Sequence, residues 1–372
     1  MGAATAHFIS KTSRSKILLL DRYGIGNDYC SSNDVNRVFR YSYGGDEYYT
    51  RMAVDSLGLW RQLEQESGQH LLTATGLLLI EGEDESANKF NEASYRTLLR
   101  MGLGAEKFEE GDLKKRFPQF KTRRGFLDPN GGVLLASKAL SAFTGQAQAR
   151  GVRFLQDQAR TINADRLIQV ATITGETVRC RKLVVTVGPW SNGLLTPRLP
   201  SITPTRQQLI YFQARGGMDR FRPESCPVFF TDKHYGLPTA GIDAVKVSPK
   251  ELTEQVDPET ANRSVDMEQV EACRDMCRRF IPDLAEGKVV QTKVCLYDMT
   301  KNSDFVLDRD PDNPNVIYGY GFSGHGFKFA PLVGKLLGEL ALDKKTGFDI
   351  SRFTALPFHR GPGTTGSHLG KG

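Results

Sequence analysis

A short apolar strand, followed at once by a glycine-rich turn and a helix, constrains the fold of this chain most. Residues 316–320 (VIYGY) predict the strand, residues 321–327 (GFSGHGF) the turn and residues 330–342 the helix. Gly321, Gly324 and Gly326 leave no side chains where the backbone passes close to another group. This order is typical of α/β domains that bind nucleotides. A length of 372 residues with 39% hydrophobic residues is enough for about two such domains.

The opening residues fit the second half of a dinucleotide-binding fingerprint. Gly2 begins a helix-like segment, and a buried strand over 16–21 (KILLLD) ends at Asp21. In the complete fingerprint, a strand and three glycines open the helix, and an acid about 20 residues further on binds the ribose hydroxyls. Gly2 matches the last glycine and Asp21 the acid, whereas the first strand and the first two glycines have no counterpart. We therefore predict a Rossmann-like domain that is incomplete at its N-terminus.

The middle of the chain is rich in predicted strands. A hairpin is predicted over 167–181 and a buried strand over 183–188, with helices over 46–66, 86–101, 137–150 and 266–281. The predicted fold class is mixed α/β, a Rossmann-like domain with an inserted antiparallel-sheet substrate domain. The predicted boundaries are 1–75, 130–200 and 295–355 for the nucleotide-binding domain, 76–129 and 201–294 for the substrate domain, and 356–372 for a disordered tail.

Composition excludes several classes of protein. The net charge of +6 is scattered, which argues against a nucleic-acid partner. No apolar run approaches the roughly 18–20 residues that cross a bilayer, so no membrane association is expected. The cysteines are irregularly spaced, and Cys273 and Cys277 share the apolar stripe of a predicted helix. We therefore predict no metal site and a reducing intracellular compartment.

Several motifs together carry a resemblance to a known family. They are the C-L-Y of residues 295–297, the D-F-V-L-D of 304–308, the G-F-S-G-H-G-F-K of 321–328, the R-V-F-R of 37–40, the G-G-V of 131–133, the G-P-W of 188–190 and the Y-G-L-P of 235–238. With these motifs the chain resembles the monomeric sarcosine oxidase family of FAD-dependent amine oxidases, with its peroxisomal sarcosine/pipecolate oxidases nearest. The resemblance extends over nearly the whole chain.

The resemblance implies FAD bound covalently, through a bond from its 8α-methyl carbon to the sulfur of Cys295. A thiolate is the nucleophile that such a bond requires. The glycines of the turn would then face the flavin ring, and the following helix would direct its N-terminal amides toward it. His325 would either add positive charge there or make a structural hydrogen bond.

The resemblance also implies the residues on the substrate side. Arg40 and Lys328 would bind the substrate carboxylate, one with a planar fork and the other as a point charge. Arg37 matches a second arginine that lies near the flavin, and Tyr235 matches an active-site tyrosine. Lys246 matches a lysine beside flavin N5 where O2 is reduced, and a cation there favours reduction because superoxide is anionic.

Two positions depart from the family pattern. Lys250 stands where close relatives carry a substrate-contacting histidine, and Asp34 stands where they carry a glycine. The predicted function is oxidation of a secondary or N-methyl amino acid, such as sarcosine, L-pipecolate or L-proline, to an imine, with O2 reduced to H2O2. Two alternatives remain open: a fructosyl amino acid oxidase, and a truncated or decayed relative with impaired FAD binding and no activity.

A cytoplasmic monomer is expected. The peroxisomal relatives end in a tripeptide such as Ser-Lys-Leu, which is recognised at the extreme C-terminus. Here Ser367-His368-Leu369 is followed by three further residues. A peroxisomal location is therefore expected only if the chain ended at Leu369.

Overall fold

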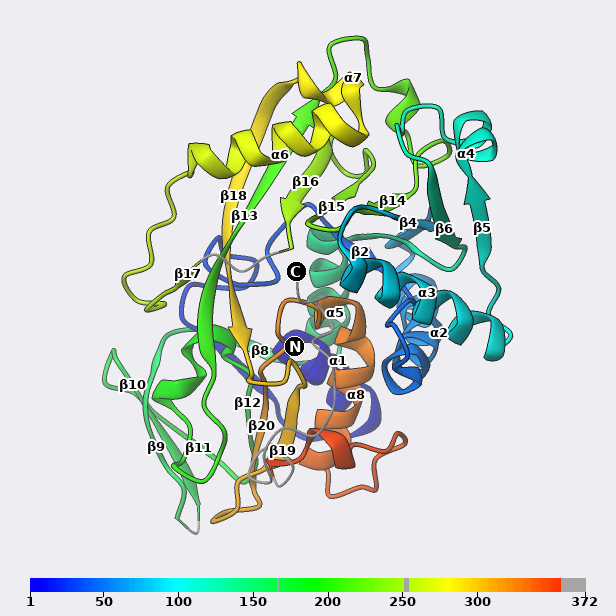
Figure 1. Ribbon diagram of the computed structural model, residues 1–372. Helices are drawn as coiled ribbons and strands as arrows, with labels where there is room; N and C mark the ends of the chain where they lie inside the picture. Colours follow the sequence, from blue (N-terminus) through cyan, green and yellow to red (C-terminus); the bar gives the residue numbers. More distant parts are fainter. Residues whose placement is uncertain (166, 251–253, 356–372) are drawn as a thin grey trace.

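The computed structural model describes residues 1–165, 167–250 and 254–355, so the predicted disordered tail lies outside the described residues. Figure 1 shows two regions, one built on long strands beneath α6 and α7, the other on α1, α5 and α8. Strands β13 and β18 run from one region to the other. The mixed α/β fold predicted from the sequence is confirmed, while its division into domains stays a prediction.

The first region is a nine-stranded mixed sheet in which most neighbours run antiparallel. Its strand order is β17-β13-β16-β15-β14-β4-β6-β5, with β18 also paired to β13. The only parallel pair in the described sheet is β14 with β4. The bounds are β4 Leu77–Ile80, β5 Glu106–Glu109, β6 Arg124–Asp128, β13 Thr203–Gln213, β14 Val228–Phe230, β15 His234–Leu237, β16 Val245–Pro249, β17 Glu254–Gln255 and β18 Lys288–Met299.

The second region contains two pieces of parallel sheet. β1 (Leu18–Asp21) pairs with β8 (Arg153–Gln156), and β12 (Leu183–Val185) pairs with β20 (Val316–Tyr320), which β19 (Val306–Arg309) joins in antiparallel. Among the described residues, no strand connects β1 with β12. The two parallel pieces agree with the expected Rossmann-like domain, while the expectation that its first strand is missing stays a prediction.

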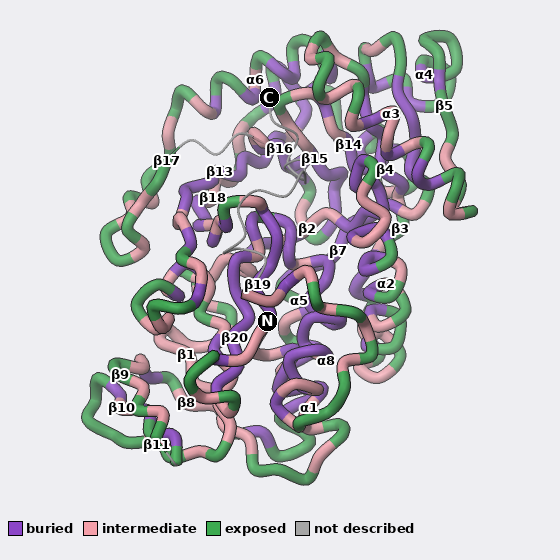
Figure 2. The backbone as a smooth tube through the Cα atoms, turned by 60° about the horizontal axis from the view of Figure 1, so that its bottom comes forward, coloured by how far each residue is buried: buried purple, intermediate pink, exposed green. Residues whose placement is uncertain are grey.

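Two small antiparallel sheets complete the strands. One has the order β2-β7-β3 and the other β11-β10-β9, which contains the predicted hairpin. Their bounds are β2 Asn36–Phe39, β3 Leu72–Ala74, β7 Gly132–Leu135, β9 Ala159–Asn163, β10 Ile168–Thr172 and β11 Thr177–Cys180. This second sheet lies at the periphery of the molecule (Figure 2), and buried, intermediate and exposed residues are mixed along its strands.

Eight α-helices occur in the described chain. They are α1 Gly2–Thr12, α2 Glu47–Ser67, α3 Glu85–Arg100, α4 Glu110–Arg116, α5 Ala136–Ala149, α6 Met267–Phe280, α7 Pro282–Ala285 and α8 Ala330–Ala341. The short 3-10 helices are Gly188–Gly193, Asp219–Phe221, Phe327–Phe329 and Ser351–Phe353. None of the described helices is long and apolar enough to cross a membrane.

Local signals explain where the helices begin and end. The side chain of Asp46 accepts hydrogen bonds from the first amides of α2, and Gly68 closes that helix in the left-handed conformation. Cys273 and Cys277 lie buried on α6, as the apolar stripe predicted. Helices α1 and α8 pack closely because Gly334 faces α1, where an added Cβ would lie 2.6 Å from the Cβ of Ala4.

Acidification is expected to destabilise this helix packing through His7 on α1. Burial lowers the pKa of His7 to about 4, despite Glu66 at 3.5 Å. The pKa of His7 in the folded protein lies below its unfolded value of about 6.5. Its contribution to the free energy of unfolding is therefore complete above pH 6.5 and is lost as the pH falls toward 4. At pH 5 the expected loss is about 2 kcal/mol.

The variant His7→Gln tests whether His7 causes this loss of stability on acidification. The free energy of unfolding of the variant should depend less on pH between 6.5 and 4 than that of wild type. Urea unfolding at a series of pH values measures both slopes, and parallel slopes would contradict the assignment.

Candidate active site

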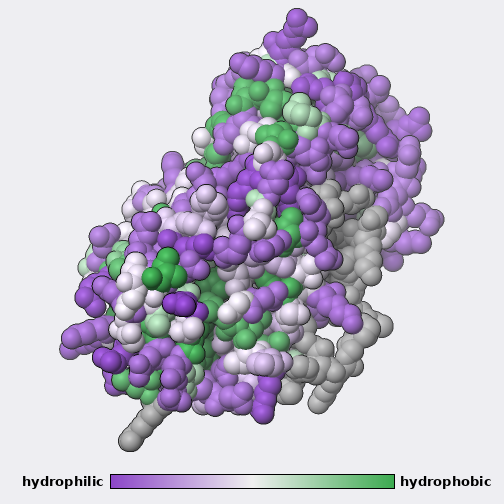
Figure 3. Space-filling view, turned by 90° about the vertical axis from the view of Figure 1, so that its left-hand side faces the viewer, coloured by the Kyte–Doolittle hydropathy of each residue, from purple (hydrophilic) through white to green (hydrophobic). Residues whose placement is uncertain are grey.

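A cavity of about 1050 Å³ lies between the two parallel sheet pieces and is also lined by residues of the nine-stranded sheet. Its walls include the whole of β1 and β12, the first turns of α1 and the end of the glycine-rich turn. The face in Figure 3 shows apolar side chains recessed among hydrophilic ones in the half of the molecule that holds these strands. Such a long, mostly apolar cavity with a few polar groups is the usual form of a cofactor site.

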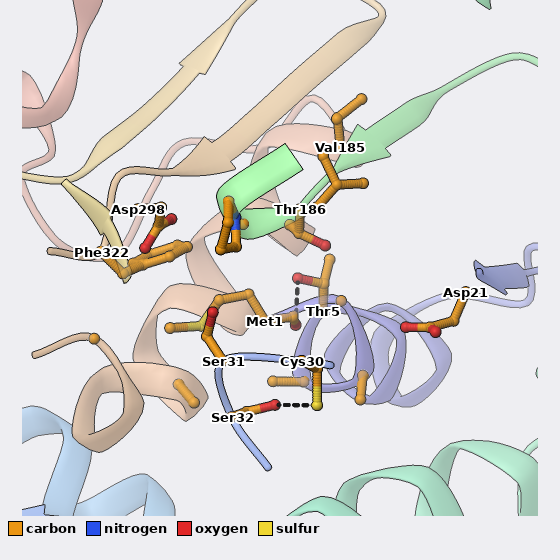
Figure 4. Close-up of a pocket in the computed structure, with 18 of the residues that line it drawn as sticks. Met1, Thr5, Asp21, Cys30, Ser31, Ser32, Val185, Thr186, Asp298 and Phe322 are labelled. Atoms are coloured by element: carbon orange, nitrogen blue, oxygen red, sulfur yellow. Dashed lines mark hydrogen bonds between the residues drawn. The ribbon is translucent and has the colours of Figure 1, made fainter. Parts of the chain in front are cut away.

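The two N-terminal residues that were predicted to bind the cofactor lie on one wall. Asp21 ends β1, accepts hydrogen bonds from Tyr23 N at 3.0 Å and from Asn27 Nδ2 at 3.2 Å, and burial raises its pKa. Gly2 opens α1, where an added Cβ would lie 2.9 Å from Thr186 Oγ1. Figure 4 shows Met1, Thr5 and Asp21 around the same space, opposite Val185 and Thr186.

Two further observations show that the wall fits a large polar ligand. Trp190 Nε1 and Gln207 Oε1 are buried, line the cavity and have no hydrogen-bond partner among the described residues. Buried polar atoms without a partner are uncommon, and a bound ligand would satisfy them. The helix N-terminus also favours a negatively charged group such as a diphosphate. The residues present therefore fit a flavin dinucleotide.

The glycine-rich turn reaches the cavity at Gly324 and Gly326, whereas Gly321 is not among the lining residues. Gly321 and Gly324 have positive φ, which favours glycine. An added Cβ at Gly324 would lie 2.6 Å from the ring of Tyr297, and one at Gly326 would lie 2.5 Å from Phe322. The turn therefore needs its glycines to pack against the protein as well.

His325 makes structural hydrogen bonds. Its Nε2 donates to the carbonyl of Ser303 at 3.0 Å, and its Nδ1 lies 3.5 Å from the hydroxyl of Tyr43. The ring is buried among Tyr49, Phe305 and Phe329. Of the two roles that the sequence left open, this geometry supports the structural one.

Arg40 and Lys328 both lie close to the ring of Tyr43. The guanidinium carbon of Arg40 is 4.3 Å and Lys328 Nζ is 5.5 Å from the centroid of Tyr43. Both side chains are buried and line the cavity. Burial and then the charge of Arg40 lower the pKa of Lys328 well below its usual value. Two buried cations in one cavity favour an anionic ligand, here a carboxylate.

Two contacts position Lys328, and sequence reasoning missed both. Lys328 Nζ donates to the carbonyl of His325 at 2.6 Å, and the carbonyl of Lys328 accepts from Trp60 Nε1 at 2.8 Å. Trp60 belongs to the apolar stripe of α2, where periodicity indicates only a core residue. Tyr43 carried no signal other than its position three residues after Arg40.

Lys246 and Arg37 also line the cavity, and both donate to the carboxylate of Asp34. Lys246 Nζ donates to Asp34 Oδ2 at 2.8 Å and to the carbonyl of Asn36 at 2.5 Å. Arg37 also donates to Asp34, and to the carbonyl of Ser31 at 2.8 Å. The fold therefore pairs Lys246 with a carboxylate from the loop that precedes β2, 212 positions away in the sequence.

Tyr235 and Cys295 take different positions relative to the cavity. Tyr235 lines it, and burial raises the pKa of its hydroxyl. Cys295 on β18 is 2% exposed and is not among the lining residues. Burial raises the pKa of its thiol, and the nearby Arg37 and Lys246 oppose this shift.

Lys250 extends the cationic side of the cavity. Its Nζ donates to the carbonyl of Thr231 and lies 5.0 Å from the ring centroid of Phe230, above which Arg40 also lies, at 5.2 Å. Burial and then the charge of Arg40 lower the pKa of Lys250 to about 7. Lys250 therefore lines the same cavity as Arg40 and Lys328.

Comparisons with known proteins agree with this arrangement. The chain is 33% identical to the peroxisomal sarcosine oxidase of Homo sapiens over 368 residues, covering 95% of this chain and 92% of the human protein. It is 29% identical to the monomeric sarcosine oxidase of Bacillus sp. (strain B-0618), covering 95% and 93% of the two chains. The resemblance inferred from the motifs is therefore confirmed.

Solved structures share the fold. NikD, described as an unusual amino acid oxidase essential for nikkomycin biosynthesis, superposes with a TM-score of 0.82 at 24% identity, covering 95% of this chain and 94% of NikD. Glycine oxidase from Geobacillus kaustophilus gives a TM-score of 0.83 at 18% identity, covering 95% of each chain. The family described as FAD dependent oxidoreductase matches residues 1–340. The chain belongs to this family of FAD-dependent oxidoreductases.

Proposed function

We propose that this chain oxidises a small secondary or N-methyl amino acid to an imine, which water then hydrolyses. The observation that carries the proposal is the pair of buried cations, Arg40 and Lys328, beside Tyr43 in the cavity that Gly2 and Asp21 also line. The names of the relatives, which are sarcosine oxidases and an N-methyl-L-tryptophan oxidase, support the substrate class.

The residues divide into two groups. Gly2, Asp21, Gly324 and Gly326 would hold FAD, which supplies the hydride acceptor and, once reduced, the electrons that convert O2 to H2O2. Arg40 and Lys328 would bind and orient the substrate carboxylate. Their positive charges also lower the pKa of a bound amine, because they disfavour a third cation nearby. The neutral amine needed for oxidation would then form without a strong general base.

The experiment is purification of the chain with FAD, followed by anaerobic addition of substrates. Sarcosine, L-pipecolate or L-proline should bleach the flavin absorbance, and air should restore it with release of H2O2. Bleaching by a fructosyl amino acid alone would favour the deglycating alternative. A colourless protein that gains no flavin on titration would favour the decayed relative and overturn the proposal.

We further propose that FAD is attached covalently to Cys295. Burial raises the pKa of this thiol, and the charges of Arg37 and Lys246 nearby offset part of that rise and so favour the reactive thiolate. Cys295→Ala should therefore release all its flavin on acid precipitation, whereas wild type should keep it. Fluorescence of the protein band on a denaturing gel measures the bound flavin.

Cys30 provides a matched control, because it is a second cysteine and itself lines the cavity (Figure 4). Cys30→Ala should keep the fluorescent band. Loss of the band in Cys30→Ala, with the band retained in Cys295→Ala, would assign the link to Cys30 instead.

A further inference from the structure

The Asp34 carboxylate is enclosed by groups that donate to it. Its side chain has no exposed surface, and its Oδ2 lies 2.8 Å from the ammonium of Lys246, which is 1% exposed. Arg37 donates to the same oxygen, and the hydroxyl of Tyr211 donates to Oδ1. One carboxylate therefore balances one of two neighbouring cations.

The two cations face the cavity, whereas Asp34 is not among the lining residues. With Asp34 ionised, the group of Asp34, Arg37 and Lys246 carries a net charge of +1. An uncharged residue at position 34 would leave +2. Charges at sites removed from water act strongly on their neighbours, because little solvent screens them.

We infer that Asp34 is a buried counter-ion that restrains the reaction of reduced flavin with dioxygen, by offsetting positive charge on the cavity wall. The inference rests on the proposed function, in which Lys246 and Arg37 face the flavin. Dioxygen takes two electrons and one proton from the reduced cofactor and a second proton from water, and becomes H2O2. The first electron produces anionic superoxide, which nearby positive charge stabilises. Asp34 is thus a positioning residue that acts through Lys246 and Arg37.

Three variants test the inference through the net charge of the group. Asp34→Asn gives +2, wild type +1, Lys246→Met 0, and the double variant +1 again. Each protein is reduced anaerobically with substrate and mixed rapidly with oxygenated buffer. Reoxidation of Asp34→Asn should be about tenfold faster than that of wild type, equal to about 1.4 kcal/mol of activation free energy. Lys246→Met should be slower, and the double variant should return toward the wild-type rate.

A second measurement distinguishes an effect of the Asp34 charge on the flavin from an effect of Asp34 on the position of Lys246. The midpoint potential of the flavin should become more positive in Asp34→Asn, because added positive charge favours the reduced, anionic cofactor. If Asp34 only holds Lys246 in place, the variant should reoxidise more slowly and its potential should stay unchanged. Asp310→Asn is the control, since Asp310 is also buried, accepts from the backbone amides of Asp312 and Asn313 in its own turn and does not line the cavity.

The possible failures are distinguishable. Absence of flavin reduction by every amino acid tested would overturn the proposed function, and this inference with it. Normal reduction by substrate, with reoxidation of Asp34→Asn unchanged or slower, would overturn this inference alone. If Asp34→Asn does not fold, the double variant decides, because it removes both partners of the ion pair: a rate that stays as low as in Lys246→Met would contradict a role for net charge.

Discussion

Arg40→Met is expected to lower kcat/KM for the amino acid substrate about a thousandfold. The change removes a bidentate, charge-assisted hydrogen-bonded contact to the substrate carboxylate in a buried cavity. This loss corresponds to about 4 kcal/mol of transition-state binding. Arg40→Lys should recover only part of the loss, because an ammonium lacks the planar fork. Anaerobic flavin reduction at a series of substrate concentrations measures the effect without involving O2.

The stability of the Arg40 variant is an internal check. Burying a cation costs free energy, and an apolar side chain of similar length removes that cost, so the melting temperature should not fall. Arg51→Met, on the exposed face of α2, is the control and should keep wild-type kcat/KM. Wild-type kcat/KM in Arg40→Met would show that the carboxylate binds elsewhere.

Lys246→Met is expected to slow reoxidation of the flavin by O2 about a hundredfold, while reduction by substrate changes less than about threefold. The ammonium lies on the cavity wall, and its loss leaves the charges of Asp34 and Arg37 to cancel. A hundredfold change corresponds to about 2.7 kcal/mol of stabilisation of the superoxide-forming step.

Stopped-flow traces of the two half-reactions, recorded separately, measure this prediction. Lys293→Met on β18 is a suitable control, because Lys293 pairs with the exposed Asp28 and does not line the cavity. Equal slowing of both half-reactions in Lys246→Met would indicate a general disturbance of the site and count against the assignment.

The local elements could be predicted because their signals are local. The helices expected over 46–66 and 266–281 occur as Glu47–Ser67 and Met267–Phe280, each preceded by a capping aspartate. The strand expected over 183–188 is shorter, because Gly188 has a positive φ and opens a 3-10 helix. Apolar runs predict a strand without showing where its last ladder hydrogen bond lies.

The motif around Cys295 did not predict that its thiol is buried away from the cavity. The family resemblance implied that Cys295 bonds to the flavin, yet β18 pairs along nearly the whole of β13, and the thiol packs beside Leu209, Tyr211 and Ala244. Alternation along a strand indicates that successive side chains point to opposite faces. It does not show which face borders the cavity.

The sequence by itself determined the parts of the site. They are the glycine-rich turn between β20 and α8, the acid that ends β1, and the basic residues Arg37, Arg40, Lys246 and Lys328. Only the tertiary structure decided which of these charges meet. Asp34 and Lys246 are 212 positions apart, and their contact exists because β16 brings the lysine against the loop that precedes β2. Propensity and periodicity act over a few neighbouring residues, whereas the pairing of buried charges depends on how distant strands pack.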